Sequence, residues 1–236
     1  MLQMKKAPRR ETQPGNEAEP VDDAQSTLTE KAYRALEEMI VTLKLAPGSV
    51  VSEAALSQLL GIGRTPIREA LHRLAHEHLV TILPRRGIIV SEVNIMTQLR
   101  LLEVRREVER LMARAASKRA SPAERESFRR IEEGMQKAAS GNDDIAFMRL
   151  DRAFNQLLTQ AARNDFAAGA ISLMQSLSRR FWYIHYRQVA DMPLAARLHG
   201  AVALAIAEGD AERAAAASDA LMDYIEDFTR ATVTAG

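Results

Sequence analysis

The stretch "GRTPIREALHRL", residues 63–74, decides the fold of the N-terminal part of this 236-residue chain. Its Thr-Pro pair is typical of a helix start, because a proline at the first helical position gives up an N–H that has no partner there anyway. We therefore predict a helix over 65–78, with Thr65 as its cap. Apolar residues at helical spacing predict its buried stripe: Ile67, Ala70, Leu71 and Leu74.

The opposite face of this predicted helix is polar and rich in arginine. The residues expected to point outward are Arg64, Thr65, Arg68, His72 and Arg73. An arginine fork matches O6 and N7 of guanine in the major groove and also pairs bidentately with phosphate. This face is therefore suited to DNA, as in the second helix of a helix-turn-helix. The alternative is a solvated charged face, on which Glu69 and Arg73 form an ordinary i,i+4 ion pair.

The flanking sequence completes a winged helix-turn-helix over residues 27–92. Apolar spacing predicts a helix over 28–44, and Ser52 is expected to cap a short helix whose buried side is Leu56, Leu59 and Leu60. Gly61 is expected to end that helix in a left-handed conformation. Residues 79–93 are β-branched and interrupted by Pro84 and Gly87, which predicts two strands joined by a basic turn. The tip of this wing is Arg85, Arg86 and Gly87.

After Asn94 the sequence shows only the apolar spacing and caps of helices, with no strand pattern. It therefore predicts an all-α domain over 95–232. We expect about six helices, near 94–119, 122–139, 143–162, 164–188, 193–208 and 210–231. The motif "SPAE" at 121–124 is a capping box with proline at the first helical position. Residues 1–26 are polar, contain prolines and show no hydrophobic period, which predicts a disordered tail. The fold class is thus mainly α, a winged helix-turn-helix followed by a helical bundle.

Composition excludes several classes of protein. The chain has no cysteine, so disulfides and thiolate metal sites are ruled out, and the composition suits a reducing cytoplasm. The net charge of +1 creates no global field for nucleic acid or membrane. The apolar runs are far shorter than the ~20 residues of a membrane helix. We expect a cytoplasmic protein that has no membrane partner.

The segment "LSQLLGIGRTPIREALHRLAHEHLV…PRRGIIV" resembles the DNA-binding domain of the GntR family of bacterial transcription regulators. The resemblance covers about residues 28–92. It implies that Arg64, Thr65, Pro66 and Arg68 read or grip a palindromic operator, and that Arg86 and Gly87 form the wing contact. Family members often carry Arg or Glu shortly after the position of Ser52, whereas Ala54 and Ala55 stand here.

The helical half resembles the FCD effector domain of the FadR-like subgroup. The similar segments are "LLEVRREVERLMARAAS" (101–117), "DRAFNQLLTQAARN" (151–164) and "HGAVALAIAEGDAERA" (199–214). The resemblance implies a homodimer and a pocket for a small-molecule effector. Many members bind a divalent metal such as Zn²⁺ or Ni²⁺ through Asp and His residues. Asp151 and His199 match that set, Asn155 replaces one His, and the final His is missing.

Three interpretations of these residues stay open at the level of sequence. Asp151, Asn155 and His199 could hold a metal, although such a site needs at least three good ligands. They could form hydrogen-bonded core contacts instead, or they could bind an organic acid directly, with Arg105 or Arg106 pairing with its carboxylate. Tyr224 is a further candidate for this pocket, and the aromatic run at 178–186 suits the pocket, a dimer seam or the core.

Taken together, the sequence predicts a homodimeric transcription regulator, expected to be a repressor, whose operator affinity an effector changes. The sequence leaves two other functions open. One is a winged-helix adaptor that binds protein instead of DNA. The other is a metal-dependent enzyme built on Asp151 and His199; we find no nucleophile–base motif, phosphate loop or HExxH to support it.

Overall fold

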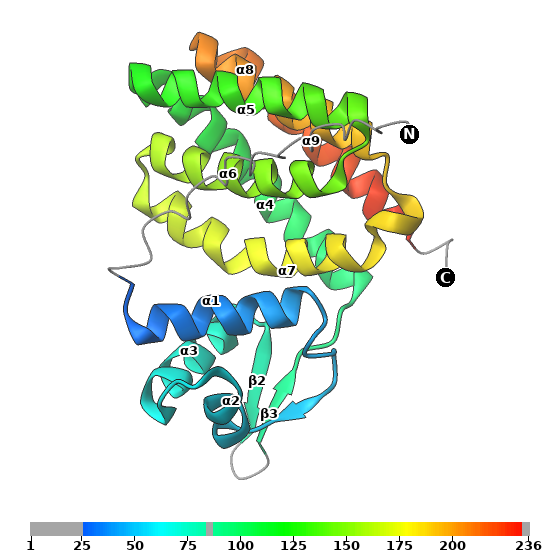
Figure 1. The fold of residues 1–236 in the computed structure, drawn as a ribbon. Helices are drawn as coiled ribbons and strands as arrows, with labels where there is room; N and C mark the ends of the chain where they lie inside the picture. The colour runs from blue at the N-terminus through cyan, green and yellow to red at the C-terminus, as the bar shows by residue number, and fades with distance from the viewer. Residues whose placement is uncertain (1–25, 84–86, 233–236) are drawn as a thin grey trace, which may run out of the picture.

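The computed structural model describes residues 26–83 and 87–232. Its N-terminal unit contains three helices and three short strands (Figure 1). These are α1 (Leu28–Val41), β1 (Val50–Val51), α2 (Glu53–Leu60), α3 (Arg64–His76), β2 (Val80–Leu83) and β3 (Gly87–Val90). The expected winged helix-turn-helix is therefore confirmed. The tail over residues 1–25 and the wing tip over residues 84–86 lie outside the described part of the chain.

The apolar stripe of α3 forms the centre of this unit. Ile67, Ala70, Leu71 and Leu74 are all buried, as predicted, and they share one core with Ala32, Leu36 and Ile40 of α1 and with Leu56 of α2. Leu79, Val80, Ile88 and Val90 close the core from the side of the sheet. Burial of this stripe leaves the opposite face of α3 on the surface of the molecule.

The small sheet is antiparallel with the strand order β1-β3-β2. Leu83 pairs with Gly87 at the turn end of the hairpin, and Val50 pairs with Ile89. The strand β1 was not predicted. Its two residues are too few to show an alternating pattern, and the pairing comes from the return of β3 beside it.

Three local predictions in this unit are wrong. The helix α3 begins at Arg64 with Gly63 as its N-cap, and Thr65 makes no capping hydrogen bond. Pro66 is consequently the third helical residue, a position that still lies among the N–H groups without a helical acceptor. The first intrahelical bond of α3 runs from the amide of Ile67 to the carbonyl of Gly63, at 3.3 Å.

The other two errors concern helix ends and one leucine. The helices α1 and α3 stop at Val41 and His76, two to three residues early, and Leu43 and His78 just beyond them adopt positive φ. Leu59 is 62% exposed. It lies with Val50 and Val51 along a shallow apolar groove between α2 and the sheet. The eight-residue α2 presents only Leu56 fully to the core.

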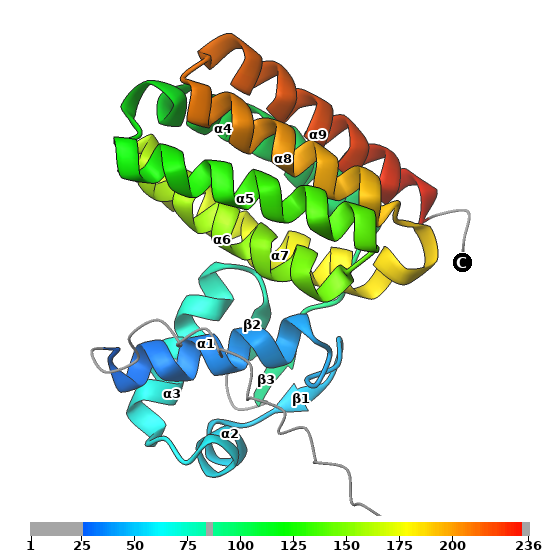
Figure 2. The same ribbon diagram turned by 45° about the horizontal axis from the view of Figure 1, so that its top comes forward.

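The second unit is a bundle of six helices, as predicted. They are α4 (Ile95–Arg119), α5 (Pro122–Gly141), α6 (Asp144–Ala162), α7 (Asp165–Val189), α8 (Met192–Glu208) and α9 (Ala211–Ala231). The capping box of Ser121 and Glu124 is present at the start of α5. The helix α4 packs against α6, α7, α8 and α9, and α5 lies along α8 (Figure 2). No helix in the described ranges combines the length and apolarity needed to cross a membrane.

The two units meet where α7 lies along α1 (Figure 1). Leu177 of α7 packs against the core of the N-terminal unit. The helix α1, which packs against α3, is therefore in direct contact with the bundle.

The aromatic centre of the bundle yields a first prediction. Phe128 is fully buried, and its ring meets that of Phe154 edge-on with centroids 6.2 Å apart. Replacing Phe128 with Ala leaves a cavity, so we expect the free energy of unfolding to fall by about 3–5 kcal/mol in urea titrations. The matched control is Phe166→Ala, because Phe166 is 92% exposed. A comparable loss in both variants would contradict the assigned core.

Candidate nucleic-acid interface and effector site

The outward face of α3 presents the N-terminal arginines to solvent. Arg64, Thr65, Arg68 and His72 are exposed, and Pro66 is half-buried. Positions 65, 68 and 72 share one side of the helix because they are spaced by three and seven residues. A rigid row of donors is thereby held at one end of α3, as a helix that enters the major groove requires.

Glu53 orients Arg68 across the helix-turn-helix. The Arg68 guanidinium donates from Nε to Oε1 of Glu53 at 2.9 Å and from Nη2 to Oε2 at 2.8 Å. This hydrogen bond raises the pKa of Arg68 and lowers the pKa of Glu53. Both side chains stay well exposed, so the pair is weak enough for Arg68 to exchange Glu53 for a base or a phosphate. No local pattern in the sequence indicates this contact, because the two residues lie fifteen positions apart.

Arg73 lies on a different side of α3 and contacts α1. Its Nη1 donates to Glu30 at 2.9 Å, its Nε donates to Glu77 at 3.3 Å, and its guanidinium lies 3.5 Å from the centre of the Tyr33 ring. The i,i+4 ion pair between Glu69 and Arg73, which the sequence left open, does not form. Glu69 instead accepts a hydrogen bond from Thr29. This geometry favours Arg73 as a link between α1 and α3 over a direct contact with DNA.

The described part of the wing shows why Gly87 stands at its base. Its φ is +100°, and a Cβ there would lie 3.2 Å from Cγ1 of Val50 and from the carbonyl oxygen of Val51. Glycine is thus required for β3 to approach β1, independently of any contact with DNA. Arg85 and Arg86 lie outside the described residues, and their contact with DNA stays a prediction.

Asp151, Asn155 and His199 come together inside the bundle. The Nδ2 of Asn155 donates to Oδ1 of Asp151 at 2.9 Å, and Nε2 of His199 lies 3.1 Å from the same oxygen. The other ring nitrogen of His199 is 2.8 Å from the carbonyl of Ala195. Phe147 and Phe154 meet the imidazole edge-on, with centroids 5.4 and 5.8 Å from it. His199 is therefore buried among aromatic rings, whereas Asp151 and Asn155 beside it are half-buried.

The charges of this cluster support each other. Burial alone lowers the pKa of His199, but the hydrogen bond and charge of Asp151 outweigh it, so the pKa lies above the ordinary 6.5. Burial alone raises the pKa of Asp151, and the His199 hydrogen bond reverses that, with further lowering by the charges of Arg105 and Arg179. Each of the two groups therefore favours the charged form of the other.

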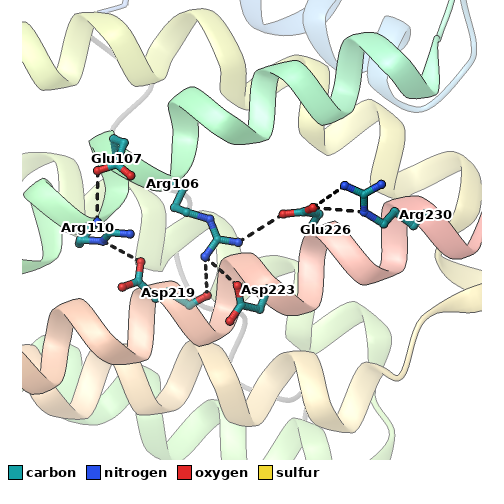
Figure 3. Close-up of polar contacts among 7 residues, drawn as sticks. All are labelled: Arg106, Glu107, Arg110, Asp219, Asp223, Glu226 and Arg230. Atoms are coloured by element: carbon teal, nitrogen blue, oxygen red, sulfur yellow. Dashed lines mark hydrogen bonds and ion pairs between the residues drawn. The ribbon is translucent and has the colours of Figure 1, made fainter.

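The two arginines considered for an effector carboxylate separate in space. Arg105 is buried and donates from Nε to Glu109 at 2.7 Å, near enough to Asp151 to affect its pKa. Arg106 reaches α9, where it contacts Asp223 at 2.7 Å and Glu226 at 3.5 Å (Figure 3). A neighbouring pair, Arg110 and Asp219, extends this α4–α9 seam. Arg105 is thus placed for a role at the cluster, whereas Arg106 joins two helices.

Tyr224 borders the aromatic side of the bundle. Its hydroxyl donates to the carbonyl of Asp191 at 3.0 Å, and its ring centre lies 6.4 Å from that of Trp182. Burial raises the pKa of Tyr224 to about 12. Trp182 in turn packs 6.1 Å from Phe147, so the aromatic run of α7 reaches the His199 cluster.

The donor set does not fit a structural zinc or nickel site. Asn155 uses its amide to donate to Asp151, and both nitrogens of His199 already have partners. Across residues 26–83 and 87–232, no three His, Asp or Glu side chains are grouped as metal ligands. A divalent ion needs three or four such ligands. The possible metal at Asp151, Asn155 and His199 is therefore poorly supported by the geometry.

Comparisons with known proteins cover both units. Residues 28–90 match the family model described as bacterial regulatory proteins of the gntR family, and residues 100–224 match the FCD domain. The chain belongs to the GntR family. This GntR-family protein is 31% identical over 193 residues to the HTH-type transcriptional repressor RspR of Escherichia coli K12, an alignment covering 79% of this chain and 83% of RspR.

Other relatives agree with this placement. The Nta operon transcriptional regulator of Aminobacter aminovorans is 28% identical over 149 residues, covering 63% of this chain and 69% of the relative. The solved structure of McbR/YncC from E. coli shares the fold, with a TM-score of 0.73 and 19% identity over 89% of this chain and all of McbR/YncC. This GntR-family protein is a DNA-binding transcription regulator with an FCD domain, a domain that binds small-molecule effectors, and its family members are not enzymes.

The Asp151–His199 pair predicts a pH dependence of stability. Because folding raises the pKa of His199, the stabilisation from its charged form is complete below the unfolded value of 6.5 and declines as the pH rises through the folded pKa. We expect Asp151→Asn to lower the free energy of unfolding by about 1–3 kcal/mol near pH 6 and by less near pH 9. Urea titrations at both values measure this difference. An equal loss at the two values would show that the pair is not ionic.

Proposed function

We propose that this protein is a cytoplasmic, homodimeric repressor that binds a palindromic operator and is released by a small anionic effector. The observation that carries the proposal is the outward face of α3, where Arg64, Thr65 and Arg68 stand opposite a fully buried stripe. A helix whose apolar side is packed into the core can enter the major groove without any change in that packing. The repressor sign is favoured by the similarity to RspR, which is a transcriptional repressor.

Operator recognition would begin with the arginines at the start of α3. Arg68, held by Glu53 before binding, can present two parallel donors to guanine. Arg64 and Thr65 lie one turn earlier, close to the helix N-terminus, where backbone N–H groups favour phosphate. Two copies of this surface, related by a two-fold axis, would match the two halves of a palindrome.

The effector site would be the polar cluster of Asp151, Asn155 and His199, with Arg105 beside it. These groups come from α4, α6 and α8, and they are the kind of convergent polar groups that fix a ligand inside an apolar core. Two cationic partners, Arg105 and the imidazolium, suit a small carboxylate, which could replace Glu109 or Asp151 as their acceptor.

The helix α4 provides exposed apolar surface for a second copy of the chain. Val104 and Leu111 are 52% and 50% exposed and lie seven residues apart, so they share one side of the helix. This side differs from the one on which Arg106 and Arg110 contact α9. In a homodimer formed through α4, the two paired bundles would set the relative positions of the two α3 helices.

The recognition face can be tested with a duplex selected from random sequence by the wild-type protein. We expect Arg68→Ala to weaken binding to that duplex by about 1–3 kcal/mol and to relax the preference at one base position. The matched control is Arg129→Ala, which removes an exposed arginine of α5. If the control weakens binding as much as Arg68→Ala, only the total charge matters. Salt-insensitive capture of a protein through the same face would instead indicate an adaptor.

The effector site can be tested with a panel of small mono- and dicarboxylates near pH 7. A true ligand at 100 times its dissociation constant should stabilise the wild-type fold by about 2.7 kcal/mol and lower operator affinity. We expect His199→Ala to abolish both responses and to leave operator binding without the acid unchanged. Arg106→Gln is the control, because Arg106 faces α9, and it should respond like the wild type. A full response in His199→Ala would place the site elsewhere.

A further inference from the structure

Two adjacent arginines of α7 attach the bundle to the N-terminal unit. Nη1 of Arg179 lies 2.6 Å from Oε1 of Glu37, a carboxylate of α1 that is 6% exposed. Nη2 of Arg180 donates at 3.2 Å to the carbonyl of Glu92, in the segment that connects β3 to α4. The bundle therefore contacts both α1, the first helix of the winged unit, and the segment that connects the winged unit to the bundle.

The attachment is polar and buried, which makes it sensitive to geometry. Arg180 is 1% exposed, and its Nε and Nη1 have no partner among the described residues. Beside it, Nε2 of Gln98 donates to Oγ of Ser178 at 3.2 Å. The bond from Arg180 to Glu92 is directional, so it favours one relative position of the two units, while the two nitrogens without a partner reduce the net stabilisation from this contact.

The ion pair of Arg179 and Glu37 is connected to α3 through neighbouring side chains of α1. Glu37 lies one helical turn after Tyr33 on α1, and Tyr33 in turn contacts Glu77, the C-cap residue of α3. Glu77 accepts from Tyr33 at 2.8 Å and from Arg73 at 3.3 Å. Each of the two buried carboxylates, Glu37 and Glu77, thus has its own arginine, one from the bundle and one from α3.

The same region of α7 borders the effector cluster. Trp182 follows Arg179 by three residues on α7, and its ring centre lies 6.1 Å from that of Phe147, whose ring meets His199 edge-on. The charge of Arg179 adds to the effects of His199 and Arg105 in lowering the pKa of Asp151. Arg179 is the more exposed member of its pair, with 35% of its side chain accessible, so it can change partner more easily than Glu37 can. An added negative charge beside Asp151 would compete with Glu37 for this guanidinium.

We propose that Arg179 is a positioning residue, which through Glu37 sets the orientation of α3 relative to the bundle and hence the spacing of the two recognition helices. An anionic effector at the Asp151 cluster draws Arg179 away from Glu37, frees α1 from α7 and lowers operator affinity. This inference rests on the proposed function for its DNA-binding consequence, whereas its claim about orientation stands on the contacts of α7.

The first test measures binding of the full chain to two duplexes, one with both half-sites of the selected operator and one with a single half-site. We expect Glu37→Gln and Arg179→Gln each to weaken binding to the full operator roughly 5- to 150-fold, the usual range of coupling between sites. Binding to the half-site should stay unchanged, because the face of α3 is intact. The double variant should be no worse than either single variant.

The second test measures orientation without DNA. Because the chain has no cysteine, single cysteines at the exposed positions Gln58 of α2 and Gln136 of α5 can carry a pair of spin labels. With labelled protein diluted in unlabelled protein, both Gln variants should shift or broaden the distance distribution between the labels. Arg129→Gln, which removes an exposed arginine within α5, should leave distances and affinities as they are.

The outcomes separate this inference from the proposed function. Equal losses on full operator and half-site would overturn it, because the ion pair would then act within the winged unit. Unchanged full-site affinity or unchanged distances in the two Gln variants would also overturn it. If the wild type selects no DNA at all, the proposed function fails, and the distance measurement alone still decides whether Arg179 and Glu37 orient the two units.

Discussion

Burial of the apolar stripe of α3 is the constraint on which the rest of the molecule depends. Ile67, Leu71 and Leu74 pack against Leu36 and Ile40 of α1, and these side chains are almost fully removed from water. Each such burial stabilises the fold by about 1.5–3 kcal/mol, more than any exposed ion pair contributes. Because one side of α3 must face inward, the arginines on its other side have to face outward, so the same pattern that folds the unit also builds the face that we propose binds DNA.

Arginine serves three different purposes in this protein, and the surroundings decide which. Arg68 is exposed and held loosely by Glu53, so it can exchange its partner for DNA. Arg73, five residues later, stacks on Tyr33 and pairs with two glutamates, so it joins two helices. Arg179 and Arg180 connect two units. In each case the planar guanidinium is used for directional contacts that a lysine could not reproduce.

The bundle combines an apolar interior with a small set of buried charges. Asp151, Asn155 and His199 keep the positions at which the resemblance to the FCD domain suggests metal ligands, yet they bond to one another. Loss of two imidazoles removes the ligands that a divalent ion needs, while the remaining groups can still exchange hydrogen bonds with an organic anion. Arg105 affects the pKa of Asp151 and is therefore available to the proposed anionic ligand, whereas Arg179 joins the bundle to α1 of the N-terminal unit.

Helix types, their order and the inward and outward faces of α3 were determined by the sequence alone, because apolar spacing and capping residues act locally. The same is true of the six bundle helices, whose N-caps are Asn, Asp or Ser residues readable in the chain. Only the tertiary structure decided which partner each charge takes: Glu53 for Arg68, Glu30 and Glu77 for Arg73, and Glu37 for Arg179. It also decided the two-residue strand β1, the exposure of Leu59 and the separation of Arg105 from Arg106. Such contacts join residues far apart in the chain, and no local period encodes them, since they exist only once the hydrophobic cores have brought the helices together.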